Sequence, residues 1–352
     1  MASHGQFEQQ YSGTITPRLG QRGSATALPA GPYSRAMDAA QPTAQVNPMV
    51  RAVLSLFAAP RLNMREDYRK VRFIQRLLAG PSGRFHTLDR SIIAAEGHEI
   101  PVRVFLPQQL DHDDVLLFFH GGGWVIGNID SYTPSCAALA DATGRVVLSV
   151  DYRLAPEHPF PAGFEDCLRV TQVLLEDPDA LDLADASGLT LIGDSAGGNL
   201  VAAVNLRLAA LGGPLPSRQI LLYPALWYDH DPATSPHDSV REYGTGLRLT
   251  ATEVMDYLAL YVPDADERRQ PLVAPLLATD LAGQPETLVI TAELDLLRDE
   301  GEAYAAKLRD ADVPVRLERA PGALHGFMTL PRFAKPVIWW HEVVNEFLAV
   351  GP

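Results

Sequence analysis

A serine lies between two glycines in the segment Gly193-Asp194-Ser195-Ala196-Gly197. The apolar run before it, residues 189–192, is typical of a buried strand, and residues 200–206 after it have helical spacing. A serine on a sharp strand-to-helix turn is exposed at the end of its strand, above helix N–H groups that can bind an oxyanion. The short motif also occurs in ordinary Gly/Ser turns, but the strand before it and the helix after it favour a nucleophile.

A serine hydroxyl is a poor nucleophile and needs a base, which in turn needs an orienting carboxylate. In folds with this turn, the order along the chain is serine, acid, histidine. His325 follows the last apolar strand and is therefore the expected base. His230 and His237 fall in an insertion away from the strand ends, and His341 lies inside the last helix, so all three are expected to be structural.

The acid is expected after the apolar strand at residues 288–291, where four carboxylates follow: Glu293, Asp295, Asp299 and Glu300. Asp299 and Glu300 begin the next helix, where the helix dipole favours acids whatever their function. Position along the chain does not separate Glu293 from Asp295.

A tetrahedral intermediate also needs hydrogen-bond donors for its oxyanion. The N–H group of Ala196 is one candidate, because it begins the helix after the serine. Another buried strand, residues 115–119, runs into a glycine series that lets the backbone approach a substrate closely: Gly121, Gly122 and Gly123. Trp124 follows directly, and we expect it either to narrow the substrate pocket or to anchor the core.

Short apolar strands alternate with helices through most of the chain. Residues 89–95 and 100–105 are predicted to form a hairpin. Further strands are predicted at 115–119, 146–150, 189–192, 220–223, 288–291 and 315–317. Helices are predicted at 132–143, 162–176, 300–308 and about 336–348. This alternation predicts an α/β fold with a mostly parallel sheet that is covered by helices on both faces.

Two regions do not fit this alternation and are interpreted as a helical cap. Residues 1–46 are loop-like in composition, and amphipathic helices are predicted at 47–59 and 64–79, with no strand partner on which to bury their apolar stripes. An insertion at about 227–283 contains a further predicted helix at 250–261. We therefore divide the chain into an extension with cap helices, residues 1–85, and a catalytic domain, residues 86–352.

Composition narrows the function classes. The 352 residues carry a net charge of −14, which argues against binding to nucleic acid or to anionic membranes. The two cysteines, Cys136 and Cys167, do not make a disulfide framework, so a reducing, cytoplasmic location is the simplest expectation. We find no cysteine and histidine cluster with metal-ligand spacing, no signal peptide and no apolar run long enough to span a membrane.

Five motifs in order resemble the hormone-sensitive-lipase branch of the α/β-hydrolases, the bacterial family IV esterases. They are His120-Gly121-Gly122-Gly123-Trp124, the segment Asp151-Tyr152-Arg153-Leu154-Ala155-Pro156-Glu157, the serine motif, Glu293-Leu294-Asp295 and His325-Gly326-Phe327. The resemblance covers about residues 85–352. One departure is Leu296, since the family usually has proline after the acid.

The resemblance implies an eight-stranded α/β-hydrolase fold and a cytoplasmic serine carboxylesterase that acts on a small-molecule ester without a cofactor or metal. It assigns Ser195 as nucleophile, His325 as base and Asp295 as acid. It also implies an oxyanion hole at Gly122, Gly123 and Ala196 with Gly121 shaping the loop, braced by the segment 151–157. An amidase, a lactonase, an acyltransferase or a non-catalytic receptor similar to the plant gibberellin receptors are the alternatives, and a homodimer is left open. The cap is expected to restrict substrates to short and medium acyl chains.

Overall fold

The computed structural model describes residues 63–79, 85–181 and 188–350, and within these ranges the chain is built around one mixed sheet. Its strands stand in the order β1-β2-β4-β3-β5-β6-β7-β8. Their bounds are β1 Thr87–Ile93, β2 Glu99–Phe105, β3 Val115–Phe119, β4 Val146–Val150, β5 Leu189–Asp194, β6 Arg218–Leu222, β7 Glu286–Leu294 and β8 Val315–Leu324. The expected eight-stranded α/β-hydrolase fold is confirmed.

The sheet is antiparallel at one edge and parallel elsewhere. β1 and β2 form the predicted hairpin, and β2 pairs antiparallel with β4. From β4 onward all neighbouring strands are parallel. Parallel strands bring their carboxyl ends to one edge of the sheet, so residues that follow β5, β7 and β8 meet there although they are distant in sequence.

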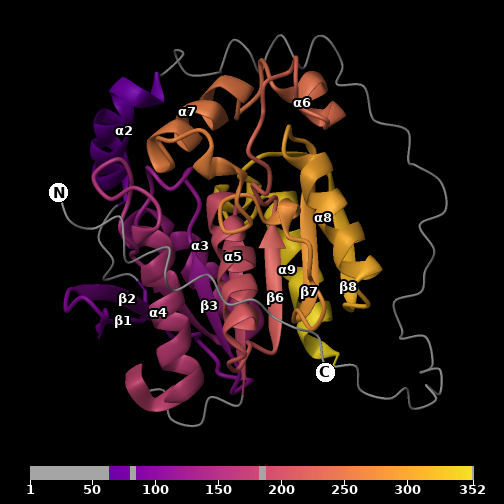
Figure 1. The fold of residues 1–352 in the computed structure, drawn as a ribbon. Helices are drawn as coiled ribbons and strands as arrows, with labels where there is room; N and C mark the ends of the chain where they lie inside the picture. Colours follow the sequence, from indigo (N-terminus) through magenta and orange to yellow (C-terminus); the bar gives the residue numbers. More distant parts are fainter. Residues whose placement is uncertain (1–62, 80–84, 182–187, 351–352) are drawn as a thin grey trace, which may run out of the picture. The chain divides into compact units, whose positions relative to one another are not determined.

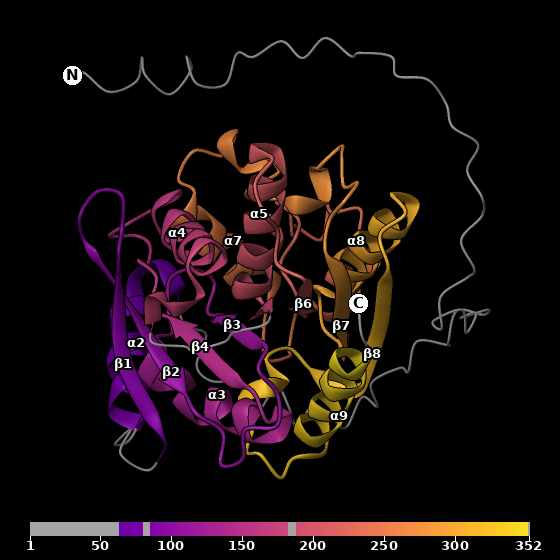
Figure 2. The same ribbon diagram turned by 90° about the horizontal axis from the view of Figure 1, so that it is seen from below.

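Helices cover both faces of the sheet, as predicted (Figure 2). One face carries α4 (Ala162–Glu176), α5 (Ala196–Leu211) and α8 (Arg298–Asp310), and the other carries α3 (Ile129–Thr143) and α9 (Lys335–Ala349). Alternate residues of β3 belong to two hydrophobic cores, one on each face of the sheet. Leu117 and Phe119 pack in the core beneath α4, α5 and α8, whereas Leu116 and Phe118 pack in the core beneath α3 and α9. Because each face is covered, these strands are apolar throughout and do not alternate with polar residues.

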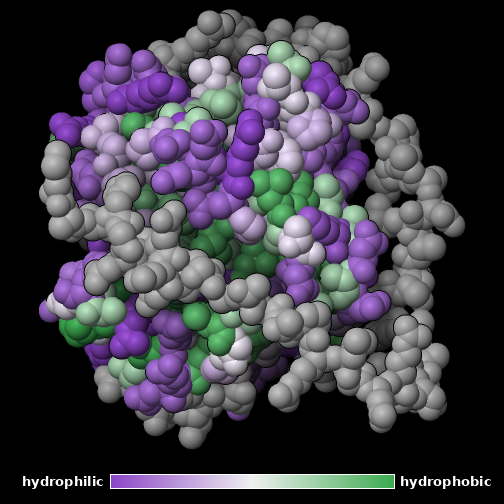
Figure 3. All heavy atoms as spheres, viewed as in Figure 1, coloured by the Kyte–Doolittle hydropathy of each residue, from purple (hydrophilic) through white to green (hydrophobic). Residues whose placement is uncertain are grey.

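Above the carboxyl ends of the parallel strands lie α2 (Met64–Leu78) and two helices of the insertion, α6 (Asp238–Tyr243) and α7 (Ala251–Tyr261) (Figure 1). α2 packs against α7, and Arg65 of α2 forms an ion pair with Asp256 of α7 at 2.6 Å. The surface over α7 is mostly polar in Figure 3, in keeping with the burial of its apolar residues underneath. Short 3-10 turns complete the fold: η3 Pro178–Leu181, η4 Glu267–Arg269, η5 Pro275–Leu277 and η6 Phe327–Thr329.

Element boundaries differ from the sequence-based expectations mainly at the carboxyl ends. β8 was expected over 315–317 but continues to Leu324, with a register shift against β7 between Ala292 and Leu294. α6 was not expected, because six residues are too few to show a helical period. The predicted helix at 47–59 and residues 1–46 lie outside the described residues. In the ranges that the structure describes, we find no helix with the length and apolarity needed to cross a bilayer.

Candidate active site

Ser195 stands on a strained turn between β5 and α5. Its backbone has φ 54° and ψ −117°, and its N–H group donates to the carbonyl oxygen of Leu222 on the neighbouring strand at 2.8 Å. A side chain at position 197 could not be accommodated, because a Cβ there would lie 1.9 Å from the carbonyl oxygen of Phe119. Glycine at this position therefore lets the turn fit against β3, and the turn holds the Ser195 hydroxyl at the strand end.

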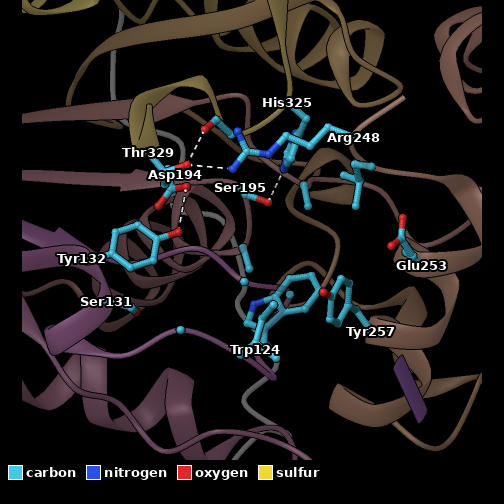
Figure 4. Close-up of a pocket in the computed structure, with 18 of the residues that line it drawn as sticks. Trp124, Ser131, Tyr132, Asp194, Ser195, Arg248, Glu253, Tyr257, His325 and Thr329 are labelled. Carbon is cyan, nitrogen blue, oxygen red and sulfur yellow. Dashed lines mark hydrogen bonds between the residues drawn. The ribbon is translucent and has the colours of Figure 1, made fainter. Parts of the chain in front are cut away.

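The serine, the histidine and one acid form a continuous hydrogen-bonded series, of which Figure 4 shows the contact between Ser195 and His325. His325 follows β8, and its Nε2 lies 2.9 Å from the Oγ of Ser195. Its Nδ1 lies 2.7 Å from Oδ2 of Asp295, which follows β7. The other oxygen of Asp295 accepts a hydrogen bond from the N–H of Leu297 at 3.1 Å, and the Asp295 side chain is fully buried.

The remaining acid and base candidates have other partners. Glu293 turns away and accepts a hydrogen bond from the N–H of Gly322 at 2.6 Å. Glu300 is buried and lies 2.7 Å from His230, so this pair joins α8 to the insertion. Asp299 pairs with Arg298. Of the two acids that position along the chain left open, only Asp295 lies against His325.

The glycine loop reaches the same place from β3. Gly122 and Gly123 have positive φ, and a Cβ on Gly123 would lie 2.2 Å from the ring of Tyr257 on α7. The N–H of Gly121 is not free, because it donates to Oδ1 of Asp194 at 2.7 Å. Gly121 thus supports the loop, whereas Gly122, Gly123 and the N-terminus of α5 border the cavity in front of Ser195.

Two further contacts brace this loop from behind. The hydroxyl of Tyr152 donates a hydrogen bond to the carbonyl oxygen of His120 at 2.6 Å. The N–H of Ala155 donates to the carbonyl oxygen of Trp124 at 2.9 Å. Both residues belong to the segment 151–157 that was expected to brace the loop. Trp124 is 2% exposed and stacks on Tyr261 with ring centroids 4.5 Å apart, so it is a core anchor that also borders the cavity.

Asp194, next to the serine, joins the nucleophile turn to the glycine loop. Besides the N–H of Gly121 it faces the hydroxyls of Tyr132 at 3.2 Å and Tyr223 at 3.4 Å. Desolvation by burial raises the pKa of Asp194 to about 6, against the hydrogen bond from Gly121 and the charge of His325, which lower it. Sequence reasoning missed this role, since nothing at position 194 indicates that residues 121, 132 and 223 surround it.

Ser195 and His325 open into a cavity of about 580 Å³, a typical volume for a small-molecule site. α2 contributes Met64 and Gln75, and Ala79 follows at its C-terminus. The insertion contributes Arg248, Leu249, Glu253, Val254 and Tyr257. Both predicted cap regions therefore line the cavity, insofar as the structure describes them. Among the described residues that line the cavity, Arg248 carries the one guanidinium, and the sequence analysis did not single it out.

Known proteins that are similar to this chain are α/β-hydrolases. A family model described as alpha/beta hydrolase fold matches residues 116–329. An arylesterase of Saccharolobus solfataricus is 35% identical over 246 residues, which is 70% of this chain and 78% of the relative. An ethyl acetate hydrolase of Pseudomonas putida is 34% identical over 300 residues, which is 81% of this chain and 92% of the relative.

Solved structures give the same likeness. A thermostable esterase from Pseudomonas putida has a TM-score of 0.76 and 28% sequence identity, covering 87% of this chain and 97% of that one. A hyperthermophilic esterase from Pyrobaculum calidifontis has a TM-score of 0.74 and 32% identity, covering 87% of this chain and 99% of that one.

Proposed function

Because this chain belongs to the hormone-sensitive-lipase-like family of α/β-hydrolases and is a carboxylic ester hydrolase, we propose that Ser195, His325 and Asp295 are its catalytic triad. The observation that carries this proposal is the hydrogen-bonded series from the Ser195 hydroxyl through His325 to the buried Asp295. A neutral imidazole with its proton on Nδ1 donates to Asp295 and accepts from Ser195, which is the arrangement that a general base requires.

The reaction proceeds in two halves through an acyl-enzyme. The Oγ of Ser195 attacks the ester carbonyl carbon while His325 takes the hydroxyl proton, and the tetrahedral intermediate expels the alcohol as His325 returns that proton to it. Water then attacks the acyl-serine, again with His325 as base, and releases the carboxylic acid. Asp295 orients the imidazole and stabilises the imidazolium that forms in each half.

We assign the oxyanion hole to the N–H groups of Gly122, Gly123 and Ala196. Ala196 begins α5, so its N–H has no partner within the helix and adds the positive end of the helix dipole. Gly122 and Gly123 border the same cavity as Ser195 and Ala196, so their backbone N–H groups can face the same oxyanion. Asp194 supports this arrangement because its carboxylate accepts a hydrogen bond from the N–H of Gly121. This bond holds the glycine loop next to Ser195.

We propose further that α2 and the insertion form a cap that limits acyl length. Tyr257 lies against Gly123, and the cavity has a volume of about 580 Å³, which supports substrates with short to medium acyl chains of about C2 to C8. The esterase relatives, one of them an ethyl acetate hydrolase, support the same size class. The two free cysteines are both buried, which supports a reducing, cytoplasmic location.

A series of p-nitrophenyl esters from C2 to C16 tests the proposal, with the corresponding p-nitroanilides to detect amidase activity. We expect kcat/KM to peak at about C2 to C8 because each added methylene gains about 0.8 kcal/mol only until the cavity is full. The variant Ser195→Ala should lose about 10⁴- to 10⁶-fold in kcat while keeping the wild-type melting curve. A maximum at C16 with activation at a lipid interface would overturn the size limit, and a fully active alanine variant would overturn the triad.

A further inference from the structure

Arg248 is a charged residue of the cavity that lies against the loop carrying His325. It lies between α6 and α7, and Figure 4 shows it beside His325, on the opposite side of Ser195 from Trp124 and Tyr257. Its Nη2 donates to Oγ1 of Thr329 at 2.8 Å. A Cβ on Gly326, the residue after the histidine, would lie 3.5 Å from the Arg248 Cζ, so the guanidinium lies against the loop that carries His325.

The guanidinium of Arg248 forms no ion pair with a carboxylate of the part of the chain that the structure describes, residues 63–79, 85–181 and 188–350. The other arginines nearby are engaged: Arg241 pairs with Asp238, and Arg298 pairs with Glu242 and Asp299. A guanidinium has five N–H donors, and the Thr329 hydroxyl takes one of them.

The two carboxylates that line the cavity already have partners. Asp194 is buried beneath the glycine loop and accepts the N–H of Gly121. Glu253 closes the N-terminus of α7, where its Oε2 accepts from both the N–H and the hydroxyl of Thr250. Most of the remaining lining is apolar, including Leu249, Val254 and Leu297. A carboxylate on a bound molecule would therefore find its strongest partner in Arg248.

We propose that Arg248 is a specificity-determining residue and that the enzyme prefers esters that carry a second, free carboxylate, such as hemiesters of dicarboxylic acids. This inference rests on the proposed function. The ester carbonyl reacts at Ser195, and the free carboxylate binds the Arg248 guanidinium through two parallel N–H···O bonds. Because the protein carries a net charge of −14, a cation beside the catalytic serine also offsets the repulsion that an anionic substrate meets.

The test compares monoethyl adipate with ethyl hexanoate, a neutral ester of the same chain length, by measuring ethanol release. A second pair, 6-acetoxyhexanoate and hexyl acetate, places the carboxylate on the alcohol side and is followed by acetate release. Wild-type enzyme should prefer the anionic member of at least one pair, mainly through a lower KM. Added salt should reduce that preference, because it screens charges that are open to water.

The variants separate charge recognition from a structural role. In Arg248→Gln, the ratio of anionic to neutral kcat/KM should fall by about 10- to 100-fold, and Arg248→Lys should recover part of it. The matched control is Arg241→Gln, an insertion arginine outside the cavity, which should leave the ratio unchanged. Equal losses on both members of a pair, or a wild-type preference for the neutral member of both pairs, would overturn the inference. The proposed function would survive either result, because the role of Ser195 is tested separately by the loss of ester hydrolysis in Ser195→Ala.

Discussion

The carboxylate of Asp295 lies 2.7 Å from His325, whereas that of Glu293, two residues earlier, binds the backbone of Gly322. We therefore predict that Asp295→Asn lowers kcat by about 10³- to 10⁴-fold, because an amide does not stabilise the imidazolium. The matched variant Glu293→Gln should retain activity within about tenfold. Steady-state kinetics on one p-nitrophenyl ester decides between them, and the reverse ranking would make Glu293 the acid.

Asp194 gives a prediction on pH and stability. Because burial raises its pKa to about 6 from 3.8, the folded protein binds this proton more tightly than the unfolded chain does. The tighter binding of this proton stabilises the folded protein by about 2–3 kcal/mol below about pH 4. This stabilisation is lost as the pH rises from about 4 to about 6. Asp194→Asn carries no such proton and should not show this loss.

Urea unfolding of the two proteins at about pH 4, 5, 6 and 7 measures the difference. The free energy of unfolding of the wild type, relative to that of Asp194→Asn, should fall between about pH 4 and 6 and then level off. Two curves that stay parallel across this range would show that the Asp194 carboxyl is not perturbed in the folded protein.

At the residue scale, the residues of the proposed triad could largely be chosen from the sequence. Serine, acid and histidine follow the ends of parallel strands that converge, so Ser195 and His325 could be chosen by order alone. The choice of Asp295 over Glu293 depended on a family resemblance, because both acids follow β7 and only their side-chain directions differ. Arg248 and Tyr257 lie in the insertion, and no pattern in the sequence indicates which of its residues face the cavity.

Among the elements, α8 holds the insertion through a buried contact. Glu300 in its first turn accepts the N–H of Leu226 at 2.6 Å and lies 2.7 Å from Nε2 of His230, and both side chains are fully buried. Glu300→Ala would leave these groups without a partner and should destabilise the protein by about 3–5 kcal/mol.

The control for this variant lies on the same helix. Glu302 pairs with Arg319 and is partly exposed, so Glu302→Ala should cost no more than about 1 kcal/mol. Thermal and urea unfolding of both variants would test the comparison. Similar losses for the two, or a stable Glu300→Ala protein, would contradict an anchoring role for Glu300.

α2 gives a second prediction at this scale. Met64, Gln75 and Ala79 line the cavity, and Arg72 donates to the carbonyl oxygens of Val125 and Ala155, both at 2.6 Å. Removing residues 1–80 should therefore change the acyl-length profile or make the protein insoluble. Removing residues 1–46 is the control and should preserve both solubility and profile. An unchanged profile after the longer deletion would exclude α2 from the cap.

Elements with a strong apolar period were predicted closely, such as β3, β4 and α4, because burial on both sides of the sheet dictates their sequences. The sequence did not predict α6 or the extension of β8 to Leu324. These segments are shaped by contacts with distant elements, and their own sequences show no helical or strand periodicity. The predicted helix at 250–261 agrees closely with α7, whose N-terminus is capped by the side chain of Thr250.

At the scale of the whole molecule, the sheet brings three distant loops to one edge and the insertion lies over them. The order of strands explains why residues 195, 295 and 325 meet, and residues of α2 and the insertion line the cavity in front of Ser195 and His325. The central claim is that Ser195 becomes covalently acylated in each turnover. Every other prediction on activity depends on it.

The most direct measurement is to trap that covalent state. The enzyme is treated with diethyl p-nitrophenyl phosphate, which phosphorylates an activated serine with loss of p-nitrophenol, and is then analysed by intact and peptide mass spectrometry. We predict one adduct per chain, located on Ser195, formed in step with the loss of esterase activity and absent from both Ser195→Ala and His325→Ala. An adduct on another residue, or complete labelling of Ser195 without loss of activity, would contradict the account.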